Sequence, residues 1–153
     1  MSAAARALAF ADVEGAYVGF RDLLVMLPAE NYPQTVVGTW DVASILAHMA
    51  GWYRELAPEF QRIVAGNPTS PGLWADFDTW NARFAAAKKP GADALDDFDM
   101  AFHEFYAAAK ETRDEHWGTD EDGTPLPVEA LFRDLAIGHT AEHRAEIEAW
   151  LSR

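Results

Sequence analysis

The chain has 153 residues, half of them hydrophobic, which is enough for one domain with a buried core. Its 25 acidic and 12 basic side chains give a formal net charge of −13, which opposes binding to nucleic acid or anionic lipid. No apolar run reaches the roughly 18 residues of a membrane span, and no signal peptide is evident. Cysteine is absent, which excludes disulfides, a thiol nucleophile on this chain and thiolate metal ligands. We therefore expect a cytoplasmic protein that binds neither nucleic acid nor membrane.

The first segment has apolar residues in alternating steps of three and four, which is typical of an amphipathic helix. Its stripe consists of Phe10, Val13, Tyr17, Phe20, Leu24 and Leu27. Pro28 and Pro33 bracket the break that follows, because proline interrupts a helix. The pattern predicts a first long helix that ends before Pro28.

A second stripe of the same period follows and predicts a second helix. It consists of Val42, Ile45, Met49, Trp52, Leu56 and Ile63. Thr39 is the expected N-cap, with Asp41 in the first turn, where a carboxylate favours the helix dipole. Gly66, followed by Pro68, is the expected end of this helix.

Residues 67–91 form a long crossover with prolines at its edges. Inside it, Leu73, Phe77, Trp80 and Phe84 keep helical spacing and predict a short extra helix. A third long helix carries Leu95, Phe98, Phe102 and Phe105 and is expected to fade near Trp117.

The segment GTDEDGTPLP reads as a loop, and its acidic residues fit a solvated turn better than a calcium site. Pro127 then suits the first turn of a final helix. The apolar face of that helix consists of Val128, Phe132, Leu135, Ile147 and Trp150. No segment shows the two-residue alternation of a strand. We expect an all-α protein, a four-helix bundle that fills residues 1–153 as a single domain.

Three of the five histidines occupy positions where an apolar residue is expected. His139 and His143 lie four residues apart on the apolar face of the last helix, so their imidazoles leave the same side. His48 lies between Ile45 and Trp52 on the second helix. Neutral imidazoles in an apolar interior need partners, and a divalent cation would supply one to all three. The alternative is three separately hydrogen-bonded core histidines.

We expect ordinary structural roles, not metal binding, for the remaining two histidines. His103 lies on the opposite side of its helix from the apolar stripe, and His116 lies near a helix end, where it can interact with the last carbonyls.

Three nitrogen ligands would leave a coordination position open, as in catalytic zinc sites. Such a site lowers the pKa of a bound water or thiol, so a small-thiol cosubstrate is chemically reasonable. No general base is evident. Glu55 and Glu146 are in helical phase with the histidines and are candidate hydrogen-bond partners for them, although exposed helix carboxylates explain both at least as well.

Other polar and aromatic residues near the histidines have weaker claims to a role. Trp52, Trp80 and Asn81 are candidate pocket residues, although core packing explains the two tryptophans equally well. The inverted zinc-peptidase pattern His-x-x-Glu-His, with Glu142 as base, is disfavoured because Glu142 lies about 100° around the helix from His143 and few residues follow for a third ligand.

Two segments resemble signatures of the DinB-like superfamily. TWDVASILAHMAGW (residues 39–52) resembles its second helix, and GHTAEHRAEI (residues 138–147) resembles its last helix. The superfamily includes DNA-damage-inducible DinB proteins, YfiT-like proteins, bacillithiol transferases and the metal-binding part of mycothiol-dependent maleylpyruvate isomerase. The resemblance implies an up-down-down-up bundle that often forms a homodimer.

The resemblance also implies a metal site at His48, His139 and His143, with Zn or Ni favoured over Mn or Fe. A low-molecular-weight thiol such as bacillithiol, mycothiol or glutathione is the implied cosubstrate. We therefore expect a metal-dependent thiol S-transferase or hydrolase that acts on a small electrophile. Two alternatives stay open: a non-catalytic protein that sequesters a metal or small molecule in a stress response, and a structural helical domain without metal.

Overall fold

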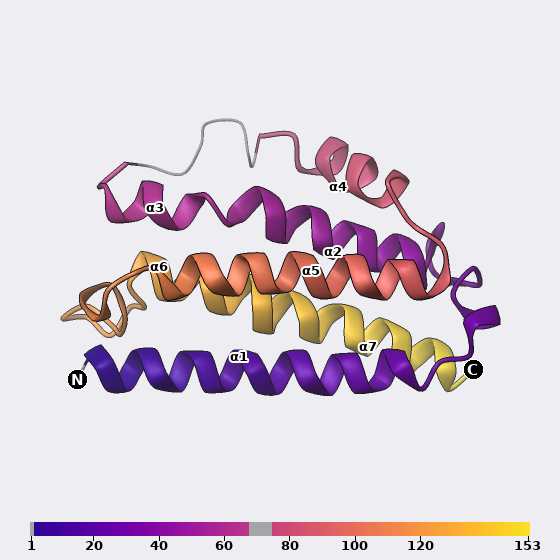
Figure 1. Ribbon diagram of the computed structural model, residues 1–153, viewed down its shortest axis with the longest axis horizontal. Coiled ribbons are helices and arrows are strands. Elements are labelled where there is room, and N and C mark those ends of the chain that lie inside the picture. The colour runs from indigo at the N-terminus through magenta and orange to yellow at the C-terminus, as the bar shows by residue number, and fades with distance from the viewer. Residues whose placement is uncertain (1, 68–74) are drawn as a thin grey trace.

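The computed structural model describes residues 2–67 and 75–153, and most of them lie in helices (Figure 1). The long helices are α1 (Ser2–Val25), α2 (Val42–Leu56), α5 (Gly91–Lys110) and the C-terminal pair α6 (Pro127–Arg133) and α7 (Thr140–Leu151). Figure 1 shows α2 and α5 running in one direction, with α1 and the C-terminal helices running in the other. The expected all-α, up-down-down-up bundle is therefore confirmed.

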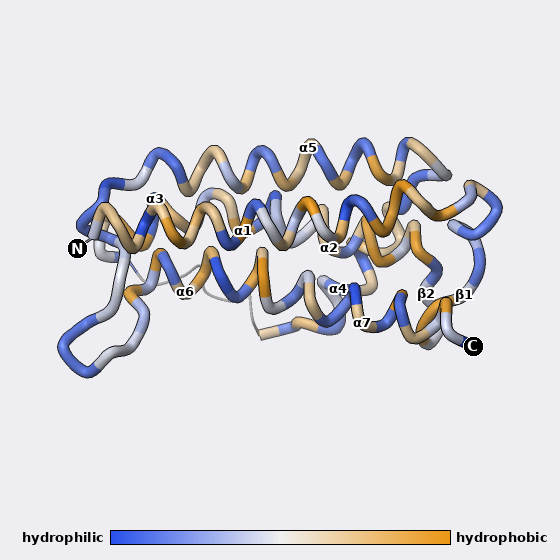
Figure 2. The backbone as a smooth tube through the Cα atoms, turned by 90° about the horizontal axis from the view of Figure 1, so that it is seen from below, coloured by the Kyte–Doolittle hydropathy of each residue, from blue (hydrophilic) through white to orange (hydrophobic). Residues whose placement is uncertain are grey.

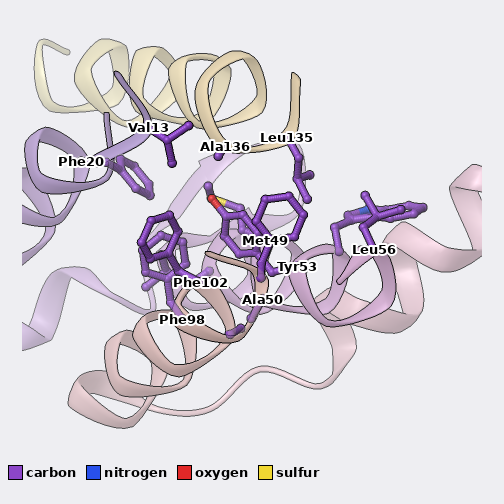
Figure 3. Close-up of a cluster of buried hydrophobic side chains, with 14 of the residues drawn as sticks. Val13, Phe20, Met49, Ala50, Tyr53, Leu56, Phe98, Phe102, Leu135 and Ala136 are labelled. Atoms are coloured by element: carbon purple, nitrogen blue, oxygen red, sulfur yellow. The ribbon is translucent and has the colours of Figure 1, made fainter. Parts of the chain in front are cut away.

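The core lies between these helices, because each helix turns one apolar face inward. Phe20 from α1, Tyr53 from α2 and Phe98 from α5 are almost completely buried, and Figure 3 shows them in one cluster. Tyr17 stacks on Phe102 with ring centroids 3.9 Å apart. Full burial of such a side chain contributes about 1.5–3 kcal/mol. Figure 2 shows hydrophobic and hydrophilic residues alternating along the helices, the pattern of amphipathic helices.

The connection between α1 and α2 differs from the prediction. After a 3-10 turn, η1 (Ala29–Asn31), a small antiparallel hairpin forms from β1 (Thr35–Val37) and β2 (Trp40–Asp41), with Val37 opposite Trp40. Gly38 has a φ of 55°, which suits the tight turn between the two strands. The prediction of no strand was wrong here, because strands of two and three residues are too short to show an alternating pattern.

The predicted N-cap of α2 was also wrong. Asp41, not Thr39, caps the helix, since its Oδ1 accepts hydrogen bonds from the Ser44 backbone nitrogen at 2.7 Å and from Ser44 Oγ at 2.9 Å. Lys88 Nζ donates to the other carboxylate oxygen at 2.6 Å. The hairpin fixes where the chain enters α2 and therefore where His48 lies.

The second predicted helix is two helices. α2 ends at Leu56, and α3 (Glu59–Val64) begins after Pro58, whose ring cannot continue a helix. The third helix is shorter than predicted: α5 ends at Lys110, a 3-10 turn, η2 (Asp114–His116), follows, and buried Trp117 donates from Nε1 to Thr112 Oγ1 at 2.9 Å. In the acidic loop, Asp120 accepts from the backbone nitrogens of Asp122 and Thr124, as in a self-capped turn.

The extra helix in the crossover is present as α4 (Phe77–Ala86), although Leu73 lies outside the described residues. α4 packs on α2 at Gly51, where a Cβ atom would lie 2.2 Å from Phe84 Cγ. Trp52 Nε1 donates to Asn81 Oδ1 at 2.7 Å across the same interface. The glycine therefore permits the close approach, and the indole hydrogen bond fixes it.

No described helix is both long enough and apolar enough to cross a lipid bilayer.

Candidate metal centre

The structure brings His48, His139 and His143 together in the interior of the bundle. His48 comes from the middle of α2, and the other two come from the C-terminal helix. His48 and His143 are 3% and 5% exposed, and His139 is partly exposed. His139 Nε2 lies 2.8 Å from Nε2 of both other histidines. The three rings therefore turn the same nitrogen toward one point, and among the described residues they form a group that could hold a metal ion.

A π-helical turn determines where His139 lies. The C-terminal helix passes from α6 through the π segment η3 (Asp134–His139) into α7, and His139 is its last residue. π turns are rare and occur often at functional sites. The wider turn brings Asp134 and His139, five residues apart, to the same side of the helix, whereas in a regular α-helix they would point about 140° apart.

Glu146 orients His143. Its Oε2 lies 2.7 Å from His143 Nδ1, one turn along α7. A carboxylate accepts a hydrogen bond at this position, so a neutral His143 ring carries its hydrogen on Nδ1 and presents a lone pair on Nε2. Glu146 thus acts as one of the two carboxylate partners that the sequence suggested.

The interior disfavours protonation of the other two rings. Burial, followed by the charges of His139 and His143, lowers the pKa of His48 to about 3. Burial, followed by the charge of His143, lowers the pKa of His139 to about 3. Both imidazoles are therefore neutral at ordinary pH, the form in which histidine binds metals.

Hydrogen bonds alone cannot satisfy the three converging nitrogens. A neutral ring nitrogen either donates or accepts, and His143 Nε2 must accept. If His139 Nε2 donates its one hydrogen to His143, His48 Nε2 meets that same N–H with either a lone pair or a second N–H, and neither makes a separate hydrogen bond unless the one hydrogen is shared. His48 Nδ1 is also buried and has no hydrogen-bond partner among the described residues, and the Trp40 and His48 ring centroids lie 4.7 Å apart. A cation that accepts all three lone pairs removes this conflict, so the residues present fit a divalent metal.

A cavity of about 270 Å³ opens next to His139. Its described walls come from α2, α4 and the C-terminal helix and consist of Trp52, Leu56, Phe77, Leu131, Asp134, Leu135 and His139. Trp52 and Phe77 stack with ring centroids 5.1 Å apart. Because His139 belongs to both the histidine cluster and this wall, the cavity gives small molecules a route to the cluster.

Several predicted residues lie elsewhere. Glu55 lines a second cavity, between α2, α4 and α5, with Gly51, Arg54 and Phe84, and no described hydrogen bond joins it to a histidine. Trp80 packs against Phe84 and under the Arg83 guanidinium instead of lining the cavity beside His139.

Glu142 is exposed, as the argument against the peptidase pattern requires. Asn81 contacts a wall of the cavity beside His139 by accepting a hydrogen bond from Trp52 Nε1.

The other two histidines are remote from the cluster. His103 Nδ1 lies 2.6 Å from the Asp99 carbonyl oxygen on the exposed side of α5. His116 lies in η2, with Nε2 3.6 Å from a Glu115 carboxylate oxygen, and no described hydrogen bond joins its ring to the last carbonyls of α5.

Sequence reasoning missed Trp40 and Asp134. Trp40 packs on His48 from β2, and that hairpin has no pattern in the sequence. Asp134 reaches the cavity only because of the π turn, for which no sequence feature stands out.

Comparison with known proteins found a solved structure with a similar fold. No family model matches the chain, and no curated protein matches it either. A crystal structure of the mycothiol-dependent maleylpyruvate isomerase superposes with a TM-score of 0.69 and 12% sequence identity. The match covers 93% of this chain and 60% of that one, so the chain spans less than two thirds of that protein's length. At this identity the likeness shows the fold, and it confirms the helical bundle that the sequence predicted.

Proposed function

We propose that His48, His139 and His143 hold one divalent metal ion and that the protein is a metal-dependent enzyme. The observation that supports this proposal is the convergence of three imidazole Nε2 atoms, with His139 Nε2 2.8 Å from each of the other two, in an arrangement that hydrogen bonds alone do not satisfy. Zn and Ni both suit three imidazole ligands, and the resemblance to the DinB-like superfamily favours them over Mn or Fe. The cavity next to His139 gives the reaction a place to occur.

The proposed reaction is the transfer of a low-molecular-weight thiol to a small electrophile, or the hydrolysis of that electrophile. When bound, the ion would lower the pKa of a thiol or water and so supply a nucleophile near neutral pH. The chain has no cysteine, so a thiol must come from a cosubstrate. The mycothiol dependence named for the structurally similar isomerase supports a thiol cosubstrate.

The chain's own residues have separate tasks in this scheme. Glu146 keeps the proton of His143 on Nδ1 and holds the ring in place. Trp52, Leu56 and Leu135 exclude water from the cavity beside His139. Asn81 holds the Trp52 indole, and thereby one wall of the cavity, in a fixed position.

A screen of thiols against small electrophiles tests this function. Chelator-treated protein is reloaded with Zn, Ni or Mn and compared with His139→Ala and with His103→Ala, a matched control on the exposed side of α5. We expect turnover only in reloaded wild type and in the control. Metal binding without turnover of any pair would favour the alternative, a sequestering protein; turnover in the presence of chelator would contradict the metal-dependent enzyme.

We also propose that the protein is a cytoplasmic homodimer. The outer surface of α1 supports dimerisation, because Leu8, Val18 and Val25 each expose more than half of their surface there. Sedimentation at micromolar concentration should show twice the monomer mass, and replacement of Val18 and Val25 by Lys should give monomers. A monomeric wild type would contradict this proposal.

A further inference from the structure

The cavity beside His139 has a chemical character of its own. Apart from Asp134 and His139, every described lining residue is aliphatic or aromatic. Trp52 is 2% exposed and Leu56 1%, while Leu131 is partly buried against the core. A surface of this kind binds apolar groups and gains little from polar ones.

The size of the cavity sets the size of the ligand. An apolar cavity of about 150 Å³ holds benzene. At about 270 Å³, this cavity has room for one ring with a short substituent. The Trp52 and Phe77 rings, stacked 24° from parallel, give one wall an aromatic character that suits a flat ring.

Asp134 gives the cavity a charge. It is the one charged side chain among the described lining residues, it is exposed, and no described cation pairs with it. It begins the π segment that His139 ends, so the carboxylate and the imidazole lie one wide turn apart on the same wall. The chain as a whole carries a net charge of −13. The Asp134 carboxylate and the net negative charge of the chain both repel a ligand that carries a negative charge at the Asp134 end.

We infer that this cavity selects ligands with an apolar body the size of one ring that are neutral or cationic at the Asp134 end. This inference rests on the proposed function: in that function the cavity would hold the organic part of the substrate while the reacting group lies at His139. A carboxylate-bearing substrate would have to place its charge toward the histidines and not toward Asp134.

Calorimetric titration of the chelator-treated full chain with three probes tests the inference. The probes are benzylammonium, benzyl alcohol and benzoate. We expect the first two to bind in the roughly millimolar range of small fragments. We expect benzoate to bind at least about fivefold more weakly, the effect of a carboxylate a few ångströms away.

Two variants locate the effect. Asp134→Asn should remove the preference for benzylammonium over benzoate, whereas Asp22→Asn, an exposed control on α1, should leave it unchanged. Leu131→Trp should fill the cavity and weaken all three probes more than tenfold, with an unchanged helical circular dichroism spectrum as the check on folding.

Equal affinity for benzoate and benzylammonium in wild type, an unaltered preference in Asp134→Asn, or unaltered affinities in Leu131→Trp would each overturn the inference. These measurements use metal-free protein, so failure of metal binding would contradict the proposed function without changing them. Metal binding combined with failure of the probes would contradict the inference alone.

Discussion

At the scale of single residues, Glu146 connects the histidine cluster to the rest of α7. Because it fixes the proton of His143 on Nδ1, its loss frees the ring to rotate and to change tautomer. Carboxylates in this position typically contribute 10–100-fold to metal affinity. Its effect should therefore appear in binding and not in folding.

We predict that Glu146→Ala weakens Zn binding about tenfold or more, while Glu146→Gln, which still accepts a hydrogen bond, loses less. The matched control is Glu142→Ala, an exposed neighbour on the same helix that should bind Zn as wild type does. Competition with a chromophoric chelator measures the affinities. Equal affinity in Glu146→Ala and Glu142→Ala would contradict a role for this contact.

The second prediction at this scale concerns Gly51. A Cβ here would meet Phe84 at 2.2 Å, so Gly51→Ala must displace α4 or strain the Trp52–Asn81 hydrogen bond. We expect destabilisation of about 1–3 kcal/mol, the usual cost of overpacking.

Gly15→Ala is the matched control for Gly51→Ala. Gly15 is also in a helix but has nothing within 4 Å of its Cβ position, so alanine there should be neutral or stabilising. Urea denaturation compares the two variants with wild type, and equal stability of both variants would show that α4 does not pack as described.

At the scale of elements, the start of α2 depends on Asp41. Burial alone would raise the pKa of Asp41, but hydrogen bonds from Lys88 and Ser44 outweigh burial and hold the pKa below its ordinary value. A carboxyl whose pKa is lowered by folding stabilises the protein above its unfolded pKa, near 3.8, and this stabilisation is lost as the pH falls through the folded value.

We predict that Asp41→Asn lowers the free energy of unfolding by about 1–2 kcal/mol at neutral pH. The difference from wild type should stay constant from pH 8 to 5 and shrink below about pH 4, where the wild-type carboxyl also becomes protonated. Denaturation curves across this range measure it. A difference that grows at low pH would show that Asp41 does not stabilise the folded state through its charge.

The elements also show how far the sequence could predict this molecule. The 3.6-residue apolar period predicted the bundle and placed His48, His139 and His143 on inward faces, since helical phase follows directly from spacing. The apolar period could not predict two local departures from regular helices. The Trp40 hairpin is too short to have a pattern, and the π turn before Thr140 depends on packing against neighbouring helices, so the contribution of Asp134 to the cavity could not be foreseen.

At the scale of the whole molecule, the histidine cluster joins two helices that are far apart in sequence. An ion bound at His48 and His143 would tie α2 to the C-terminal helix, and a ligand that binds only the folded state must stabilise it. At a free metal concentration of about 100 times the dissociation constant, the gain is about 2.7 kcal/mol.

We predict that Zn-loaded wild type melts roughly 5–10 °C above the chelator-treated protein. His48→Ala should show no such difference, while His116→Ala, in η2 away from the cluster, should keep it. Differential scanning calorimetry measures the shift. Equal melting temperatures with and without chelator in wild type would favour the structural-domain alternative.

Metal stoichiometry tests the central claim most directly. Protein purified without a nickel column is analysed by inductively coupled plasma mass spectrometry, as wild type and as His139→Ala. The account predicts about one divalent ion per chain in wild type and almost none in the variant. A wild type that takes up no Zn, Ni, Mn or Fe, or a variant that retains a full complement, would contradict it.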